Sequence, residues 1–252
     1  MTRFERLGTG IDRPLETTPD EKHFPVKSCF PRGTLVHTDE GLVPIEQIKI
    51  GDLVLSQPEM TGAIEYKPVL RTLCHQGETI LAIEYVVDGD GGNSSMLCPT
   101  GSHPFWVVDE GWRRADLLDS GARLLLADSR TAIVLSCVPV YRTRELGVGW
   151  YQKNEFNDHV GFERSFGDGP AVGRAAVPRD DEIYFSDDSQ LRLTVYNFEV
   201  EDNHTYYVGG VGVWVHNDDC SGMSMWNGAP REVAKGLPVL VDATESPSHG
   251  AR

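Results

Sequence analysis

The hydrophobic positions of this chain fall in short runs that Gly, Pro and Asp interrupt. Four such runs follow one another in the first half, at 34–36, 52–55, 69–73 and 79–85. They are rich in Val, Ile, Leu and Thr, and they are too short for amphipathic helices. Runs of this length and spacing predict an all-β domain rather than strands that alternate with helices.

The pattern repeats when the sequence is compared with itself at an offset of seventy positions. Residues 39–55 and 109–125 share five identities in seventeen aligned positions, where about one is expected by chance. In each copy a short segment, 45–48 or 115–118, has the pattern of a single helical turn before a strand. We therefore predict two copies of one β-rich unit, related by an approximate two-fold axis.

A long segment separates the corresponding strands of the second copy. In the first copy, the strand that ends near Leu73 continues to the next strand through a short link containing Gly77. In the second copy, the strand 132–141 reaches its expected partner, 191–200, only after about fifty residues. The intervening segment, 142–190, is rich in Gly and acidic residues, so we expect a partly ordered insertion there.

Both ends of the chain differ in composition from its middle. Residues 1–28 are polar, contain three prolines and show no sustained period. Residues 218–252 are similar, apart from one short apolar run at 237–241. We interpret these ends as flanks of one organised domain, 29–217.

The charge and the cysteine content argue against several classes of protein. The net charge of -15 repels phosphate backbones and anionic membrane surfaces, so neither nucleic acid nor membrane is expected as a partner. The five cysteines are irregularly spaced and form no disulfide framework or Cys-x-x-Cys metal site. Two of them, Cys74 and Cys137, lie within apolar runs and are expected to be buried.

Targeting signals are not evident in the sequence. No apolar window approaches the roughly 18 residues that span a bilayer, and residues 1–30 lack the apolar core of a signal peptide. We expect the chain as given to be cytoplasmic, or else a piece of a larger exported bacterial protein.

The C-terminal border of the organised region carries residues that can break their own backbone. Asn217 can attack its own carbonyl carbon through its side-chain nitrogen, close a succinimide ring and expel Asp218. An amide is a poor nucleophile, and a positioned acid or base raises such a rate by roughly two to four powers of ten. His216 is adjacent and His204 lies upstream. On its own, a His-Asn pair is more typical of a strand end.

Four motifs in order resemble the Hint superfamily, the domain shared by inteins, bacterial intein-like elements and the autoprocessing part of Hedgehog proteins. Residues 29–36 (CFPRGTLV) are similar to its opening motif, and 98–105 (CPTGSHPF) to its Thr-x-x-His motif. Residues 195–208 (VYNFEVEDNHTYYV) are similar to its penultimate block, and 213–217 (VWVHN) to its terminal block. The resemblance implies an all-β, horseshoe-like fold and is closest to the intein-like domains of bacterial polymorphic toxins.

The resemblance also implies roles for the residues at the first border. Cys29 would attack the carbonyl of Ser28 and convert that peptide bond into a thioester. His103 would donate to the backbone nitrogen of Cys29, since an imidazole can act as acid or base near neutrality. Thr100 would hold the scissile region by hydrogen bonding. Taken singly, each of these residues is more often structural.

At the second border, His204 would assist the side-chain nitrogen of Asn217, and His216 would donate to the oxygen that develops charge. Splicing inteins have Cys, Ser or Thr after the terminal Asn, whereas this chain has Asp218, which cannot accept the acyl group. We therefore predict self-cleavage at both borders, with little ligation. Neither a cofactor nor a metal is expected, the chain would act as a monomer on its own flanks, and the short acidic insertion does not indicate an endonuclease domain.

Two other functions stay open at this point. The domain could be an inactive β-rich spacer or interaction module within a larger toxin-type protein. It could also be a Cys-His hydrolase that acts on other molecules, although the nucleophile then stands at the very start of the domain and no stretch of the sequence indicates a substrate cleft.

Overall fold

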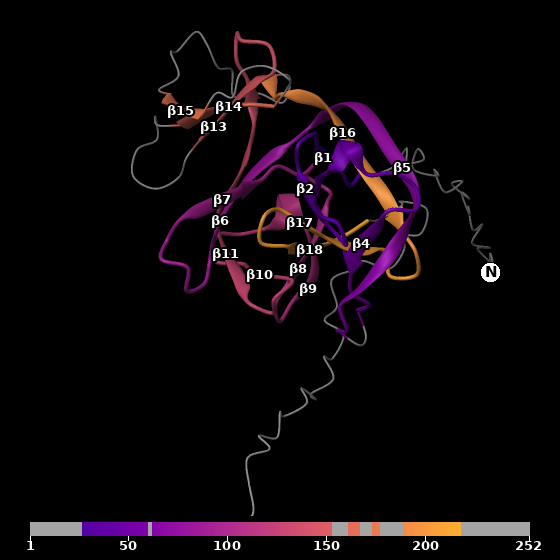
Figure 1. Ribbon diagram of the computed structural model, residues 1–252. Coiled ribbons are helices and arrows are strands. Elements are labelled where there is room, and N and C mark those ends of the chain that lie inside the picture. Colours follow the sequence, from indigo (N-terminus) through magenta and orange to yellow (C-terminus); the bar gives the residue numbers. More distant parts are fainter. Residues whose placement is uncertain (1–26, 60–61, 153–160, 167–172, 177–188, 218–252) are drawn as a thin grey trace, which may run out of the picture.

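A computed structural model describes residues 27–59, 62–152, 161–166, 173–176 and 189–217 (Figure 1). Strands make up nearly all of their regular structure, and the helical elements in these ranges are short 3-10 turns. The predicted all-β class is therefore confirmed. No helix in the described ranges has the length and apolar character needed to cross a membrane.

The strands form one large antiparallel sheet and one small one. The first part of the large sheet contains β1 (Phe30–Pro31), β2 (Leu35–Thr38), β3 (Gly41–Pro44), β4 (Leu53–Ser56), β5 (Glu65–Thr79), β6 (Leu81–Val87) and β7 (Ser94–Leu97). The second part contains β8 (Pro104–Val107), β9 (Gly111–Arg114), β10 (Arg123–Leu125), β11 (Thr131–Pro139), β16 (Arg192–Val200), β17 (Thr205–Val208) and β18 (Val213–His216). The 3-10 turns are η1 (Ile45–Gln47) and η2 (Ala115–Leu117).

The order of the strands is nearly palindromic about the β17–β18 hairpin. The sheet runs β1-β16-β5-β4-β2-β17-β18-β8-β10-β11-β6-β7, with β3 and β9 paired to β2 and β8. Val36 of β2 pairs with Val208, and Phe105 of β8 pairs with Val215, at the centre of this order. All four side chains are fully buried. The predicted two-fold repeat is therefore present, and its axis passes near this hairpin.

The repeat extends to single backbone hydrogen bonds. Gly51 N–H donates to Val69 O at 2.9 Å, and Gly121 N–H donates to Val134 O at 2.8 Å. Gly51 and Gly121 have φ angles of 93° and 92°, in the region that favours glycine because other residues carry a Cβ. The predicted helical turns also exist, as η1 and η2.

The outer strands of the two copies are exchanged, and our expected pairing of 132–141 with 191–200 was wrong. Strand β16 pairs with β5, and β6 pairs with β11. The expected link at Gly77 lies inside β5, and Ile80 alone separates β5 from β6. Because an antiparallel hairpin needs a loop of about two residues, β6 cannot fold back on β5 and crosses to the other copy.

The two cysteines expected to be buried behave differently. Cys74 is exposed, because β5 turns most of its side chains outward over this stretch. Cys137 is partly buried, and its Sγ donates to Ala115 O at 3.2 Å. The prediction was wrong for Cys74, since strand pairing rather than local hydrophobicity sets which face is covered.

The described part of the 142–190 segment forms a small sheet at one end of the molecule (Figure 1). Its strands are β12 (Tyr141–Arg142), β13 (Val148–Gln152), β14 (Gly161–Ser165) and β15 (Gly173–Ala176). Tyr151 and Phe166 pack against a cluster that contains Cys29 and Cys98. The small sheet thus touches the same apolar cluster as the first border. The rest of the predicted insertion lies outside the described residues, as do the flanks apart from Lys27 and Ser28.

Candidate functional site

Thr100 holds the first border of the domain through hydrogen bonds of both its backbone and its hydroxyl. Cys29 N–H donates to Thr100 Oγ1 at 2.9 Å, and Thr100 N–H donates to Cys29 O at 2.9 Å. The Thr100 hydroxyl itself donates to Lys27 O at 2.6 Å. Ser28 and Cys29 are both buried. The backbone is thus fixed on both sides of the Ser28–Cys29 bond, which is the bond predicted to be cut.

A tight turn presents Thr100 to this bond. His103 N–H donates to Thr100 O at 3.1 Å, which closes the turn before β8 begins. Within it, Ser102 Oγ also donates to Lys27 O, at 2.9 Å. Small hydroxyl side chains suit such turns because they can bond to nearby backbone. The turn therefore places two hydroxyls against the chain that precedes Cys29 and sends His103 into the core.

Asn197 of β16 was not among the residues predicted for the site. Its Nδ2 donates to Ser28 O at 2.5 Å, the carbonyl that Cys29 would attack. Its Oδ1 accepts from Tyr206 Oη at 2.9 Å and from Phe198 N–H at 2.8 Å, so the amide is held in one orientation. In the sequence, Asn197 stands out only as an amide between apolar residues of a predicted strand. Its contact with Ser28 follows from the pairing of that strand with the start of the domain.

His103 is completely buried, with its ring 4.2 Å from that of Phe30. Neither ring nitrogen has a hydrogen-bond partner among the described residues. Burial, with a smaller contribution from His216, lowers the pKa of His103 to about 3, while a weak interaction with the Ser28 backbone acts in the opposite direction. The ring is therefore neutral near pH 7. The expected bond to the Cys29 nitrogen is not formed here, because that N–H donates to Thr100.

Asn217 is buried at the end of β18. Its backbone N–H donates to His204 O and its Nδ2 donates to Phe198 O, both at 2.8 Å. Its Oδ1 has no partner among the described residues. Asp218 lies outside those residues. The side chain that would act as nucleophile is thus held by β16.

The two histidines of this border differ in exposure. The ring of His216 is mostly buried, and burial followed by the charge interaction with His204 lowers the pKa of His216 to about 4. His204 is exposed, has a φ of 54°, and its ring centroid lies 6.4 Å from that of His216. His204 contacts Asn217 through its backbone carbonyl rather than through its imidazole.

Strand β16 joins the two borders. Asn197 binds Ser28 O, and the next residue, Phe198, accepts from Asn217 through its carbonyl. The fold therefore brings both ends of the predicted domain to consecutive residues of one strand. The arrangement can support acyl transfer to a thiol at one end and cyclisation of an amide at the other.

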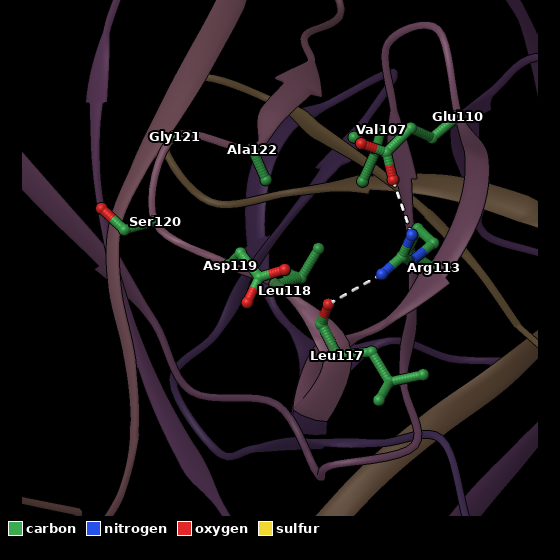
Figure 2. A pocket seen from close by; sticks show the side chains of 9 residues that line it. All are labelled: Val107, Glu110, Arg113, Leu117, Leu118, Asp119, Ser120, Gly121 and Ala122. Carbon is green, nitrogen blue, oxygen red and sulfur yellow. Dashed lines mark hydrogen bonds and ion pairs between the residues drawn. The ribbon is translucent and has the colours of Figure 1, made fainter.

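A surface depression of about 210 Å³ lies elsewhere, beside η2 (Figure 2). Arg113 borders it, and its guanidinium donates to Glu110 Oε2 at 2.7 Å and to Leu117 O at 3.2 Å. None of the site residues above lines this depression. In the described ranges, no group of three or more His, Cys, Asp or Glu side chains could hold a metal ion.

Residues 35–141 match the model of the family described as "Pretoxin HINT domain". The predicted resemblance to the Hint superfamily is therefore confirmed over this stretch. The match includes Thr100 and His103 and ends before β16.

Solved structures include similar chains. A bacterial intein-like domain from Clostridium thermocellum is 26% identical, with 75% of this chain and 98% of that chain covered and a TM-score of 0.48. A DnaB intein from Synechocystis sp. PCC 6803 is 12% identical, with 76% and 99% covered and a TM-score of 0.47. No curated protein matches this chain.

Proposed function

We propose that this chain is an autocatalytic self-processing domain that cuts its own backbone on both sides of residues 29–217. The observation that carries the proposal is the convergence of both borders on Asn197 and Phe198 of β16. The pretoxin Hint match over residues 35–141 supports it independently. Each molecule would act once on its own flanks, because the cut bonds are part of the chain.

At the first border, the thiol of Cys29 attacks the carbonyl carbon of Ser28. The Asn197 amide donates to the Ser28 oxygen, where negative charge develops, in the manner of an oxyanion-hole donor. The neutral ring of His103 takes the thiol proton and returns it to the Cys29 nitrogen as the C–N bond breaks. A thioester forms, and the amine of Cys29 is released within the chain.

At the second border, Nδ2 of Asn217 attacks its own carbonyl carbon. The C–N bond to Asp218 breaks, a succinimide closes, and the amine of Asp218 leaves with a proton. His216 donates to the oxygen that gains charge, and the carbonyl of His204 holds the backbone N–H of Asn217 in place. Because Asp218 offers no hydroxyl or thiol, thioester hydrolysis rather than transfer completes the first cut, so cleavage predominates over ligation.

Intact-mass measurement over time tests this proposal. Wild-type chain should lose the segment after Asn217, and added thiol should release the segment that ends at Ser28. Asn217→Ala should abolish only the downstream cut, and Cys29→Ala only the upstream one. If wild-type chain keeps its full mass of 27.9 kDa after prolonged incubation with thiol, the self-processing proposal fails and an inactive spacer becomes the better explanation.

A further inference from the structure

A carboxylate that follows β4 reaches the histidine of the second border. Glu59 Oε1 accepts a hydrogen bond from Trp112 Nε1 at 2.7 Å. The same oxygen lies 3.9 Å from His216 Nε2, which is within ion-pair distance. Glu59 comes from the first copy of the repeat, Trp112 from β9 of the second copy, and His216 from β18. Three separate parts of the fold therefore meet at one imidazole.

Trp112 fixes this arrangement. Its indole is buried, and its ring centroid lies 5.2 Å from that of His216 with the two planes at 78°. The position seventy residues earlier is Leu42, which has no polar hydrogen to donate. The bond to Glu59 is therefore not a general property of the repeated unit. It belongs to the copy that packs against His216.

We propose that Glu59 is a positioning residue for the cut after Asn217. Its carboxylate lies at ion-pair distance from His216 Nε2, which favours this orientation of the ring and stabilises its protonated form. His216 Nδ1 is buried without a partner among the described residues. In the protonated ring it carries the proton that passes to the carbonyl oxygen of Asn217 as negative charge develops there. The inference rests on the proposed function and adds to it a residue that none of the four motifs contains.

Other charged groups near His216 do not supply this interaction. His204 and His103 are cationic when protonated and oppose a charge on the His216 ring. On β9, Arg113 pairs with Glu110 and Arg114 pairs with Asp116, and both arginines are partly exposed. The ionisable side chains of the neighbouring strand β17 are Tyr206 and Tyr207. Both are neutral near pH 7, because the ordinary pKa of tyrosine is about 10 and burial raises it further. Glu59 is thus the acidic side chain placed to favour the imidazolium.

Glu59→Gln provides a sharp test because Gln keeps an oxygen for Trp112 and removes the charge. We expect the cut after Asn217 to slow by roughly three- to tenfold, a modest factor because the Glu59 side chain is partly exposed. The midpoint of the pH–rate profile should move to lower pH, since His216 loses its counter-ion. The rate at which added thiol releases the segment that ends at Ser28 should not change. Glu163→Gln, which removes a carboxylate from β14 of the small sheet, serves as the charge-matched control.

A second measurement separates this inference from the proposed function. In the Asn217→Ala chain, which cannot cut downstream, the ring of His216 is titrated by NMR with Glu59 and with Gln at position 59. The pKa of His216 should be lower with Gln. Equal pKa values, or equal cutting rates at every pH, would overturn the role of Glu59 even if the chain cleaves itself. If the wild-type chain makes no cut while the pKa still shifts, the self-processing proposal fails but the Glu59–His216 interaction stands.

Discussion

Replacing Thr100 by Val tests the first border with the least change in shape. The two side chains have similar volumes, but Val cannot accept from Cys29 N–H or donate to Lys27 O. Lys27 O keeps its bond from Ser102 Oγ, so Cys29 N–H is the one group that loses its partner. This N–H is buried, and an orphaned buried donor costs about 1–3 kcal/mol. The free energy of unfolding should fall by that amount.

The rate effect follows from the same contact. Without Thr100 Oγ1, the scissile amide is no longer fixed against the thiol, and a misplacement of about 1 Å can cost about 100-fold. We therefore expect thiol-dependent release of the segment that ends at Ser28 to slow by roughly 10- to 100-fold in the Asn217→Ala background. Mass spectrometry at fixed times measures the rate, and urea unfolding of the Cys29→Ala and Asn217→Ala double variant measures the stability.

Ser102→Ala is the matched control for this experiment. Lys27 O then keeps its bond from Thr100, and the backbone of the turn is unchanged. The expected loss is about 1 kcal/mol or less, with little effect on the rate. If Thr100→Val releases the upstream segment as fast as wild type while remaining folded, the idea that this hydroxyl positions the scissile bond is wrong.

Three further predictions concern the pH dependence of stability, the donor Asn197 and the packing of the small sheet. His103 and His216 have folded pKa values of about 3 and about 4, below the ordinary 6.5, so the unfolded chain binds protons that the folded chain does not. Stability should therefore fall as pH falls, by about 3 kcal/mol between pH 6.5 and pH 5 in urea unfolding of an uncleavable variant, and His103→Leu should roughly halve this loss. Asn197→Leu should slow thioester formation at Ser28 by about 100-fold, because it removes the donor to the Ser28 oxygen. The rate is measured as release of the upstream segment by added thiol, and an unchanged rate would remove Asn197 from the mechanism. Gly161→Ala should lower the melting temperature, because the new Cβ would lie 2.2 Å from the buried indole of β13, and an unaltered temperature would mean that β14 can shift without cost.

Local sequence pattern determined much of the fold. Short apolar runs bounded by Gly, Pro and Asp predict strands because they are too short for helices and their β-branched side chains suit a sheet. The repeated glycines at 51 and 121 could be found in the sequence because a positive φ restricts the residue type. The motifs likewise predicted roles for Cys29, Thr100 and Asn217, because the chemistry proposed for them depends on residue type and order along the chain.

Strand pairing was decided only by the tertiary structure. The exchange of β6 and β16 between the two copies depends on contacts between residues far apart in the chain. The one-residue connection at Ile80 rules out a β5–β6 hairpin, but the sequence does not show that β5 extends to Thr79. The exposure of Cys74 follows from the same pairing. No local pattern reports which neighbour a strand will choose.

The environment of the site was likewise set by packing. The motifs placed His103 and His216 at the two borders, but burial is what holds both rings neutral near pH 7. Asn197 and Glu59 look ordinary in the sequence and gain importance only because folding brings one to Ser28 O and the other to His216. Residue type fixes what a side chain can do, whereas its neighbours in space, drawn from distant parts of the chain, fix its charge state and its partner.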